Sequence, residues 1–140
     1  MRTLWLRDRA LDLDRVRLLG VLNLTPDSFS DGGRYLDPER ALERAREMVA
    51  EGADILDLGA ESTRPGAAPV PVEEEKRRLL PVLEAVLSLG VPVSVDTRKP
   101  EVAEEALKLG AHLLNDVTGL RDERMVALAA RHGVAAVVMH

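Results

Sequence analysis

Residues 17–33 read RLLGVLNLTPDSFSDGG and join an apolar strand to a polar loop. The apolar run from Arg17 to Leu22 stops at Asn23, and the loop that follows is rich in hydroxyls, carboxylates and glycine. Apolar runs of this kind build a sheet core, whereas a dense polar loop at a strand end is typical of a functional site. The stretch therefore predicts a buried strand whose C-terminal end faces a site.

The rest of the chain alternates predicted strands with predicted helices, after a short hairpin expected over residues 3–14. Strands that alternate with helices predict parallel pairing and right-handed crossovers, and nearly continuous apolar strands indicate burial on both faces. The expected strands are 17–22, 55–58, 91–95, 113–114 and 134–138, and the expected helices are 38–52, 73–89, 100–110 and 122–131.

Polar residues follow the expected strands at their C-terminal ends, among them Asn23, Asp57, Asp96 and Asn115. In a (β/α)8 TIM barrel these ends all face one rim, whereas in a doubly wound sheet only those near the switch point converge. The repeated pattern favours an α/β fold of the TIM-barrel type.

The length of the chain is short for that fold. A complete barrel needs eight βα units and about 250 residues, so this chain is expected to supply roughly the first four and a half units. We expect residues 1–140 to form the N-terminal part of a single barrel domain, with the hairpin covering one end of its core. The alternative is a half-barrel that a second copy completes.

The composition excludes several classes of protein. The formal net charge is −5 with acids and bases intermixed, so neither nucleic acid nor a membrane surface is an expected partner. The chain has no cysteine and no apolar run of membrane-spanning length, and we expect it to be cytoplasmic. Gln is absent and Asn occurs only at Asn23 and Asn115, which makes both amides candidate site residues.

Two segments closely resemble signatures of the dihydropteroate synthase family: residues 20–33, and ESTRPG at residues 61–66. The resemblance implies a folate-pathway transferase that condenses 6-hydroxymethyl-7,8-dihydropterin pyrophosphate with p-aminobenzoate to give 7,8-dihydropteroate and pyrophosphate. It also implies Mg²⁺ as a cofactor, these small molecules as partners, and inhibition by sulfonamides. A homodimer is expected as well.

The resemblance assigns roles to individual residues. Asn23 would give its carbonyl oxygen to Mg²⁺, which prefers hard oxygen ligands. Asp31 and Arg64 would act in catalysis by stabilising the developing cation and the departing pyrophosphate. The pterin ring is expected to contact Asp96, Asn115, Val117 and Met139. The loops around p-aminobenzoate and pyrophosphate are expected to contribute Thr25, Phe29, Ser62, Thr63, Arg64 and Pro65.

Each assignment has a structural alternative. Asn23 is equally suited to capping the following turn, and Asp96 or Thr97 to serving as a helix N-cap. Val117 and Met139 have core packing as their ordinary role, and Asp57 is as consistent with a structural carboxylate as with a site residue. Two rival functions also remain: a pterin-dependent methyltransferase, against which the pyrophosphate loop at residues 25–29 argues, and a non-catalytic half-barrel module.

Overall fold

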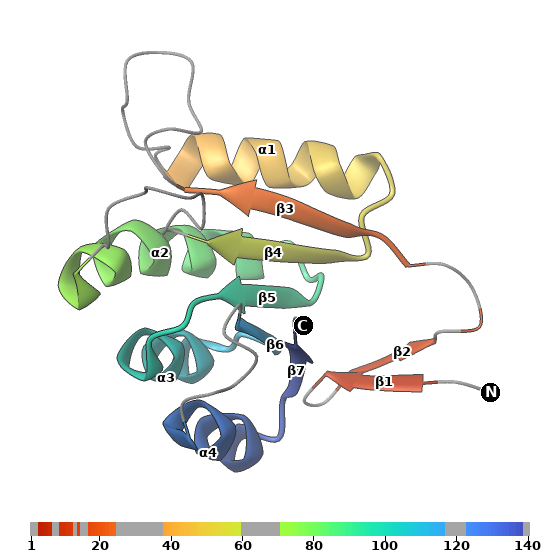
Figure 1. The fold of residues 1–140 in the computed structure, drawn as a ribbon. Helices are drawn as coiled ribbons and strands as arrows, with labels where there is room; N and C mark the ends of the chain where they lie inside the picture. The colour runs from red at the N-terminus through yellow and green to blue at the C-terminus, as the bar shows by residue number, and fades with distance from the viewer. Residues whose placement is uncertain are drawn as a thin grey trace.

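The computed structural model of the chain describes residues 3–6, 9–12, 14, 17–24, 38–59, 71–116 and 123–138. An N-terminal hairpin precedes alternating strands and helices (Figure 1). The elements are β1 (Thr3–Leu6), β2 (Arg9–Asp12), β3 (Leu19–Asn23), α1 (Pro38–Ala50), β4 (Ile55–Gly59), α2 (Val72–Leu87), β5 (Val93–Asp96), α3 (Pro100–Leu109), β6 (Leu113–Asp116), α4 (Glu123–His132) and β7 (Ala135–Val138).

The main sheet is parallel and its order follows the chain, β3-β4-β5-β6-β7. The sheet curves, and the helices α1 to α4 lie along one side of it (Figure 1). The predicted α/β class with a parallel sheet is therefore confirmed. The predicted hairpin is also present, because β1 and β2 pair in antiparallel register.

The hydrophobic core lies between the helices and the sheet. Successive strand residues point to opposite faces of a sheet. One set, including Leu22, Leu58, Val95 and Leu114, joins the apolar faces of the helices in a single buried cluster. The expected helix-ending glycines, Gly52, Gly90 and Gly110, all have positive φ, a conformation that glycine adopts without the cost of a β-carbon.

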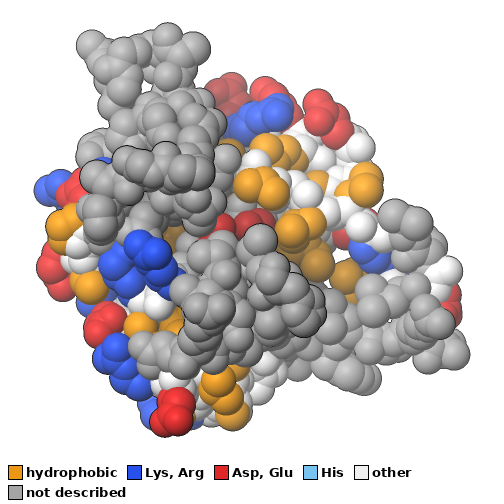
Figure 2. All heavy atoms as spheres, in the orientation of Figure 1, with side chains coloured by type: hydrophobic (Ala, Val, Ile, Leu, Met, Phe, Trp, Pro, Cys, Tyr) orange, Lys and Arg blue, Asp and Glu red, His pale blue; other side chains and the backbone are white. Residues whose placement is uncertain are grey.

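The alternate strand residues face away from the helices, and we call this side the inner face of the sheet. Its apolar residues at the β3 edge are largely uncovered: Leu19 is 45% exposed and Val21 is 51% exposed. Hydrophobic side chains accordingly gather on the visible surface over β3 (Figure 2). An apolar inner face of this kind is what a closed barrel would bury.

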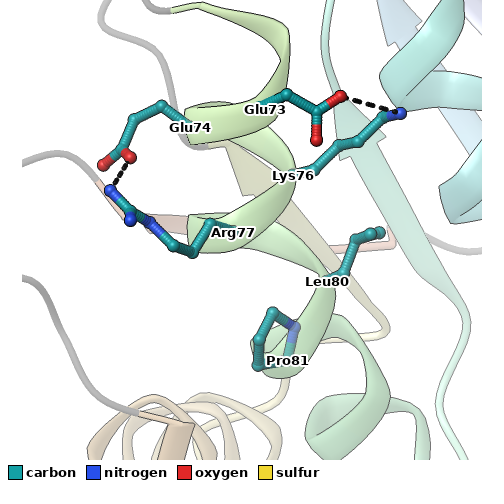
Figure 3. Close-up of a pocket in the computed structure, with 6 residues that line it drawn as sticks. All are labelled: Glu73, Glu74, Lys76, Arg77, Leu80 and Pro81. Carbon is teal, nitrogen blue, oxygen red and sulfur yellow. Dashed lines mark hydrogen bonds and ion pairs between the residues drawn. The ribbon is translucent and has the colours of Figure 1, made fainter.

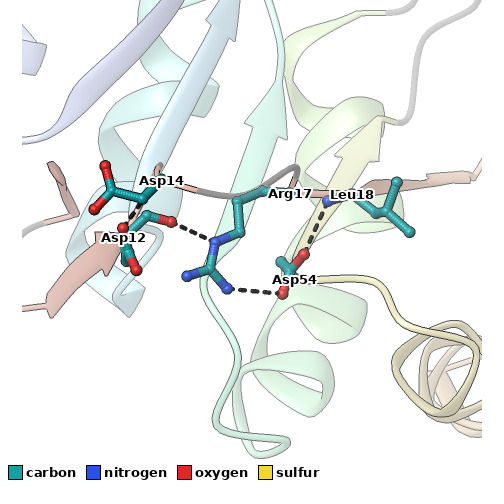
Figure 4. A network of polar contacts seen from close by, with 5 residues as sticks. All are labelled: Asp12, Asp14, Arg17, Leu18 and Asp54. Carbon is teal, nitrogen blue, oxygen red and sulfur yellow. Dashed lines mark hydrogen bonds and ion pairs between the residues drawn. The ribbon is translucent and has the colours of Figure 1, made fainter. Parts of the chain in front are cut away.

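The hairpin covers the N-terminal end of the inner face. Leu11 of β2 packs against Ile55 and Leu113, which lie near the starts of β4 and β6. A polar network anchors the connection: Arg17 Nη1 lies 3.4 Å from Asp54 Oδ1, and the Leu18 N–H donates to Asp54 Oδ2 at 2.9 Å (Figure 4). The expected covering role of the hairpin is therefore seen in this contact.

The bounds of some strands differ from the sequence-based prediction. β3 extends to Asn23, β5 to Asp96 and β6 to Asp116, so the polar residues expected in loops are the last residues of paired strands. Backbone pairing with neighbouring strands explains the extension, because a polar side chain does not prevent its backbone from joining a parallel ladder. None of the described helices is both long and apolar enough to cross a membrane.

Candidate functional site

The polar strand ends form one row across the sheet. Pairing runs from Asn23 to Gly59, then to Asp96, to Asn115 and to Val137. Residues paired across parallel strands present their side chains to the same face. Asp96 and Asn115 thus come together as the sequence predicted, at the C-terminal end of the sheet. Asn23 joins the row by its backbone, and its side chain lies outside the described part.

A buried polar cluster lies directly beneath this row. Asn115 Nδ2 donates a hydrogen bond to Asp57 Oδ2 at 3.3 Å, passing over the intervening strand β5. Asp57 and Ser94, which pair with each other in the sheet register, are both almost fully buried. Among the described side chains, Asp57 Oδ1, Asn115 Oδ1 and Ser94 Oγ are buried atoms without a hydrogen-bond partner. The carboxyl oxygen of Asp57 and the amide oxygen of Asn115 can accept hydrogen bonds, which favours a ligand that supplies N–H donors.

Burial raises the pKa of Asp57 above its ordinary value of 3.8. The neighbouring Ser94 hydroxyl and the Asn115 amide lower the pKa of Asp57 and offset part of the increase caused by burial. The Ser94 hydroxyl lies close enough to favour the charged carboxylate, although its geometry does not make a hydrogen bond. The result is a carboxyl group that keeps its proton to higher pH than an exposed aspartate does.

The raised pKa of Asp57 predicts a dependence of stability on pH. The folded protein binds this proton more tightly than the unfolded chain, so the contribution of Asp57 to stability is present below pH 3.8 and is lost as pH rises through the folded-state pKa. Asn at this position carries no titrating proton. We therefore expect the difference in unfolding free energy, Asp57→Asn minus the unaltered protein, to increase as pH rises from about 4 to neutrality. Urea unfolding of both proteins across this range measures the difference, and a constant difference would contradict the expectation.

Gly59 pairs with Asp96 in the sheet register and has no side chain that would crowd it. A β-carbon on Gly59 would lie 3.3 Å from Asp96 Cβ and 3.5 Å from Asp96 Oδ2. Such a contact is tight enough that the Asp96 side chain would have to shift. Glycine at this position thus leaves Asp96 its place on the inner face.

The alternative role of Asp96 as a helix N-cap is not what the structure shows. The N-cap of α3 is Lys99, with Pro100 following it, and no side chain caps this helix end. The carboxylate of Asp96 lies at the end of β5, partly exposed. Asp96 is therefore not the N-cap residue of α3.

Many of the predicted site residues lie outside the described part of the chain. The first loop holds Thr25, Phe29 and Asp31, and the second holds Ser62, Thr63, Arg64 and Pro65. Val117 and Met139, expected at the pterin ring, are also outside the described ranges. Both loops begin directly after strands of the main sheet, β3 and β4, at the same end as the Asp96–Asn115 row.

The predicted magnesium site depends on a single side chain. Across the ranges that the structure describes, no group of three or more His, Asp or Glu side chains is placed to hold a metal ion. Mg²⁺ commonly binds through one or two protein oxygens, with waters and substrate phosphates completing its shell. Asn23, the last residue of β3, carries a carboxamide oxygen of the chemistry that Mg²⁺ prefers.

A second surface feature does not belong to this site. A hollow along α2 is lined by Glu73, Glu74, Lys76, Arg77, Leu80 and Pro81 (Figure 3). Its charges are paired within the helix, Glu73 with Lys76 and Glu74 with Arg77. The described residues that line the hollow all belong to α2, and we assign no ligand site to them.

The sequence patterns did not lead us to predict one group of buried polar residues near Asp96. Glu75 of α2 is buried and bonds to Thr97 and Lys99, in the segment directly after Asp96. A signal was available, because Glu75 stands at the spacing of the buried apolar positions Leu79 and Val82 on the same helix. A charged residue at such a position indicates a buried partner.

Residues 19–140 match the sequence profile of the pterin binding enzymes. The chain belongs to this family. The match begins at the first residue of β3 and covers the whole parallel sheet, which places the Asp96–Asn115 row within the part common to pterin binding enzymes. The hairpin lies outside the match.

Individual pterin binding enzymes show how far the similarity extends. The dihydropteroate synthase of Bacillus subtilis is 50% identical over 129 residues, which are 91% of this chain and 45% of that protein. Two crystal structures of dihydropteroate synthase from Thermus thermophilus are similar in fold. The complex with 6HMPPP is 83% identical with a TM-score of 0.82, and covers 100% of this chain and 47% of that one. The complex with 4-aminobenzoate is 89% identical with a TM-score of 0.85, and the match covers 99% of this chain and 48% of that one.

The chain spans about half the length of these relatives. The part of the family fold seen here is therefore the parallel sheet of β3 to β7 with its helices.

Proposed function

We propose that the chain is the N-terminal part of a dihydropteroate synthase, which condenses 6-hydroxymethyl-7,8-dihydropterin pyrophosphate with p-aminobenzoate and releases pyrophosphate. The observation that carries the proposal is the Asp96–Asn115 row with unpartnered acceptors beneath it, in a chain of the pterin binding family. The similarity to enzymes crystallised with 6HMPPP and with 4-aminobenzoate supports the same two substrates.

The pterin ring carries hydrogen-bond donors that suit the acceptor oxygens of Asp96 and Asn115. Its 2-amino-4-oxo edge carries an N–H and an NH₂ group, which the Asp96 carboxylate accepts in two parallel hydrogen bonds. Asn115 is held by its Nδ2 bond to Asp57, so its Oδ1 is left to accept from the ligand. Val117 and Met139 would pack on the flat face of the ring.

The remaining contacts of the proposal lie in the two loops after β3 and β4. Thr25, Phe29, Ser62, Thr63 and Pro65 frame p-aminobenzoate, and this is where sulfonamides would compete. Arg64 pairs with the pyrophosphate, because a guanidinium binds such oxygens in bidentate fashion. Asp31 stabilises the positive charge that forms on the pterin as the pyrophosphate leaves.

Asn23 would hold Mg²⁺ together with pyrophosphate oxygens and water. When bound, the ion supplies neutralisation of the charge that develops on the leaving group. The chain's own residues orient the substrates: Asp96 and Asn115 fix the pterin, and the loop residues bring the amine of p-aminobenzoate to the exocyclic carbon.

We further propose that the inner face is closed by later strands to complete a (β/α)8 barrel, with residues 1–140 as one part of a single domain. The exposed apolar side chains at Leu19 and Val21 support closure, since the interior of a barrel buries such residues. The complete protein would be a cytoplasmic homodimer.

The test is a titration of the full-length protein with the pterin pyrophosphate, with and without Mg²⁺, followed by addition of p-aminobenzoate. We expect calorimetric binding of the pterin, and pyrophosphate release that requires both Mg²⁺ and p-aminobenzoate. Pterin binding without any pyrophosphate release would favour a methyltransferase of the same family. No binding of either the pterin or pyrophosphate would favour a non-catalytic module and overturn the proposal.

A further inference from the structure

Glu75 occupies a position of α2 at which the helix otherwise buries apolar side chains. The buried face of this helix continues through Leu79, Val82, Leu83 and Val86, and Glu75 is only 1% exposed. A buried carboxylate loses its hydration and needs close polar partners to offset that loss. Its partners therefore indicate what the charge does in the fold.

Both oxygens of the Glu75 carboxylate bind the segment that follows Asp96. The Thr97 hydroxyl donates to Oε2 at 2.5 Å, and Lys99 Nζ lies 2.7 Å from Oε1. Thr97 is itself buried, and its hydroxyl also accepts a hydrogen bond from the Lys99 N–H at 3.2 Å. Helix α2 thus contacts residues 97–99, which directly follow Asp96, from one side.

The same segment is held from the other side by the neighbouring strand. The Thr97 N–H donates to the carbonyl oxygen of Asn115 at 3.2 Å. Thr97 therefore connects Glu75 to Asn115 and immediately follows Asp96 in the chain. Any displacement of Thr97 would change the position of Asp96 relative to Asn115, the two residues that the site requires at a fixed spacing.

Stability alone is a weak reason for this arrangement. A buried ion pair is often no more stabilising than apolar residues of similar volume, because both charges lose water. Two directional bonds from one carboxylate do, however, fix a loop more narrowly than apolar contacts do. We propose that Glu75 is a positioning residue for the pterin site, acting through Thr97 and Lys99 on Asp96. This inference rests on the proposed pterin-binding function.

The experiment compares Glu75→Gln with Glu74→Gln in the full-length protein. Glu74 is the control, because it is a carboxylate of the same helix that forms ion pairs with Arg77 and Arg78 of that helix. We expect Glu75→Gln to weaken binding of the pterin pyrophosphate by about tenfold, and Glu74→Gln to leave it within about twofold. Calorimetry measures the affinity, and thermal unfolding shows that each variant is folded.

A second pair of variants keeps the inference testable if Glu75→Gln does not fold. Thr97→Val removes the hydroxyl that binds Glu75 while keeping the shape of the side chain, whereas Thr97→Ser keeps the hydroxyl. We expect Thr97→Val to lose about tenfold in pterin affinity and Thr97→Ser to retain it. Equal affinities for the two folded variants would overturn the positioning role, as would an unchanged affinity in Glu75→Gln.

Amide hydrogen exchange separates this inference from the proposed function. The Thr97 N–H is expected to exchange about tenfold faster in Glu75→Gln than in Glu74→Gln, with no ligand present. If the unaltered protein bound no pterin, the proposed function would fall, and the exchange rate would decide alone whether Glu75 orders the segment. Unchanged exchange at Thr97 would overturn the inference in either case.

Discussion

Asp96→Asn in the full-length protein is expected to weaken binding of the pterin pyrophosphate by about 100-fold. The replacement keeps the size of the side chain but substitutes an NH₂ group for one of the two carboxylate oxygens. One of the two charge-assisted bonds to the pterin edge is then lost, and a donor faces a donor. A hydrogen bond to a charged group contributes about 1.5–3 kcal/mol, an unmet donor adds a further cost, and each 1.4 kcal/mol is about tenfold in affinity. Isothermal titration calorimetry measures the change.

The matched control for this experiment is Glu101→Gln. Glu101 lies in the first turn of α3, a few residues beyond Asp96, and its exposed carboxylate pairs with Arg124 on the surface. Exposed pairs of this kind contribute little, so pterin affinity and stability should stay close to those of the unaltered protein. If Asp96→Asn bound the pterin as tightly as this control, the assignment of Asp96 to the pterin would be wrong.

Leu58→Ala is expected to lower the unfolding free energy of the full-length protein by about 2–5 kcal/mol. Leu58 is fully buried, and it lies between Leu22 and Val95 in the row of strand residues that faces the helices. Truncation to Ala removes apolar contacts and leaves a cavity that the surrounding strands cannot fill without moving. Urea denaturation followed by circular dichroism measures the loss.

Leu109→Ala provides the comparison for the same chemical change at the surface. Leu109 ends α3 and is 42% exposed, so its truncation should change the unfolding free energy by no more than about 0.5 kcal/mol. Equal losses at Leu58 and Leu109 would mean that the helix-facing side of the sheet is not the core that holds the strands together.

The sequence predicted that Asp96 and Asn115 lie at the C-terminal ends of neighbouring strands. Asp96 and Asn115 could be placed at a common edge because parallel strands present their C-terminal ends together, and the structure puts them in adjacent register. The roles proposed for Arg64, Phe29 and the other loop residues rest on the family's motifs, because periodicity predicts strands and helices but not the conformation of a polar loop.

Parallel pairing was predicted from the alternation of strands and helices, because a helical crossover joins parallel strands. Local sequence patterns by themselves determined that alternation and the glycine helix ends. These features follow from short-range rules, since the spacing of apolar residues and the freedom of glycine act over a few neighbouring positions. Only the tertiary structure decided that Asn115 bonds Asp57 across β5 and that Glu75 reaches Thr97 and Lys99. The two residues of each contact are between 22 and 58 positions apart in the sequence. Packing of the helices and strands brings them together, and no local pattern specifies that packing.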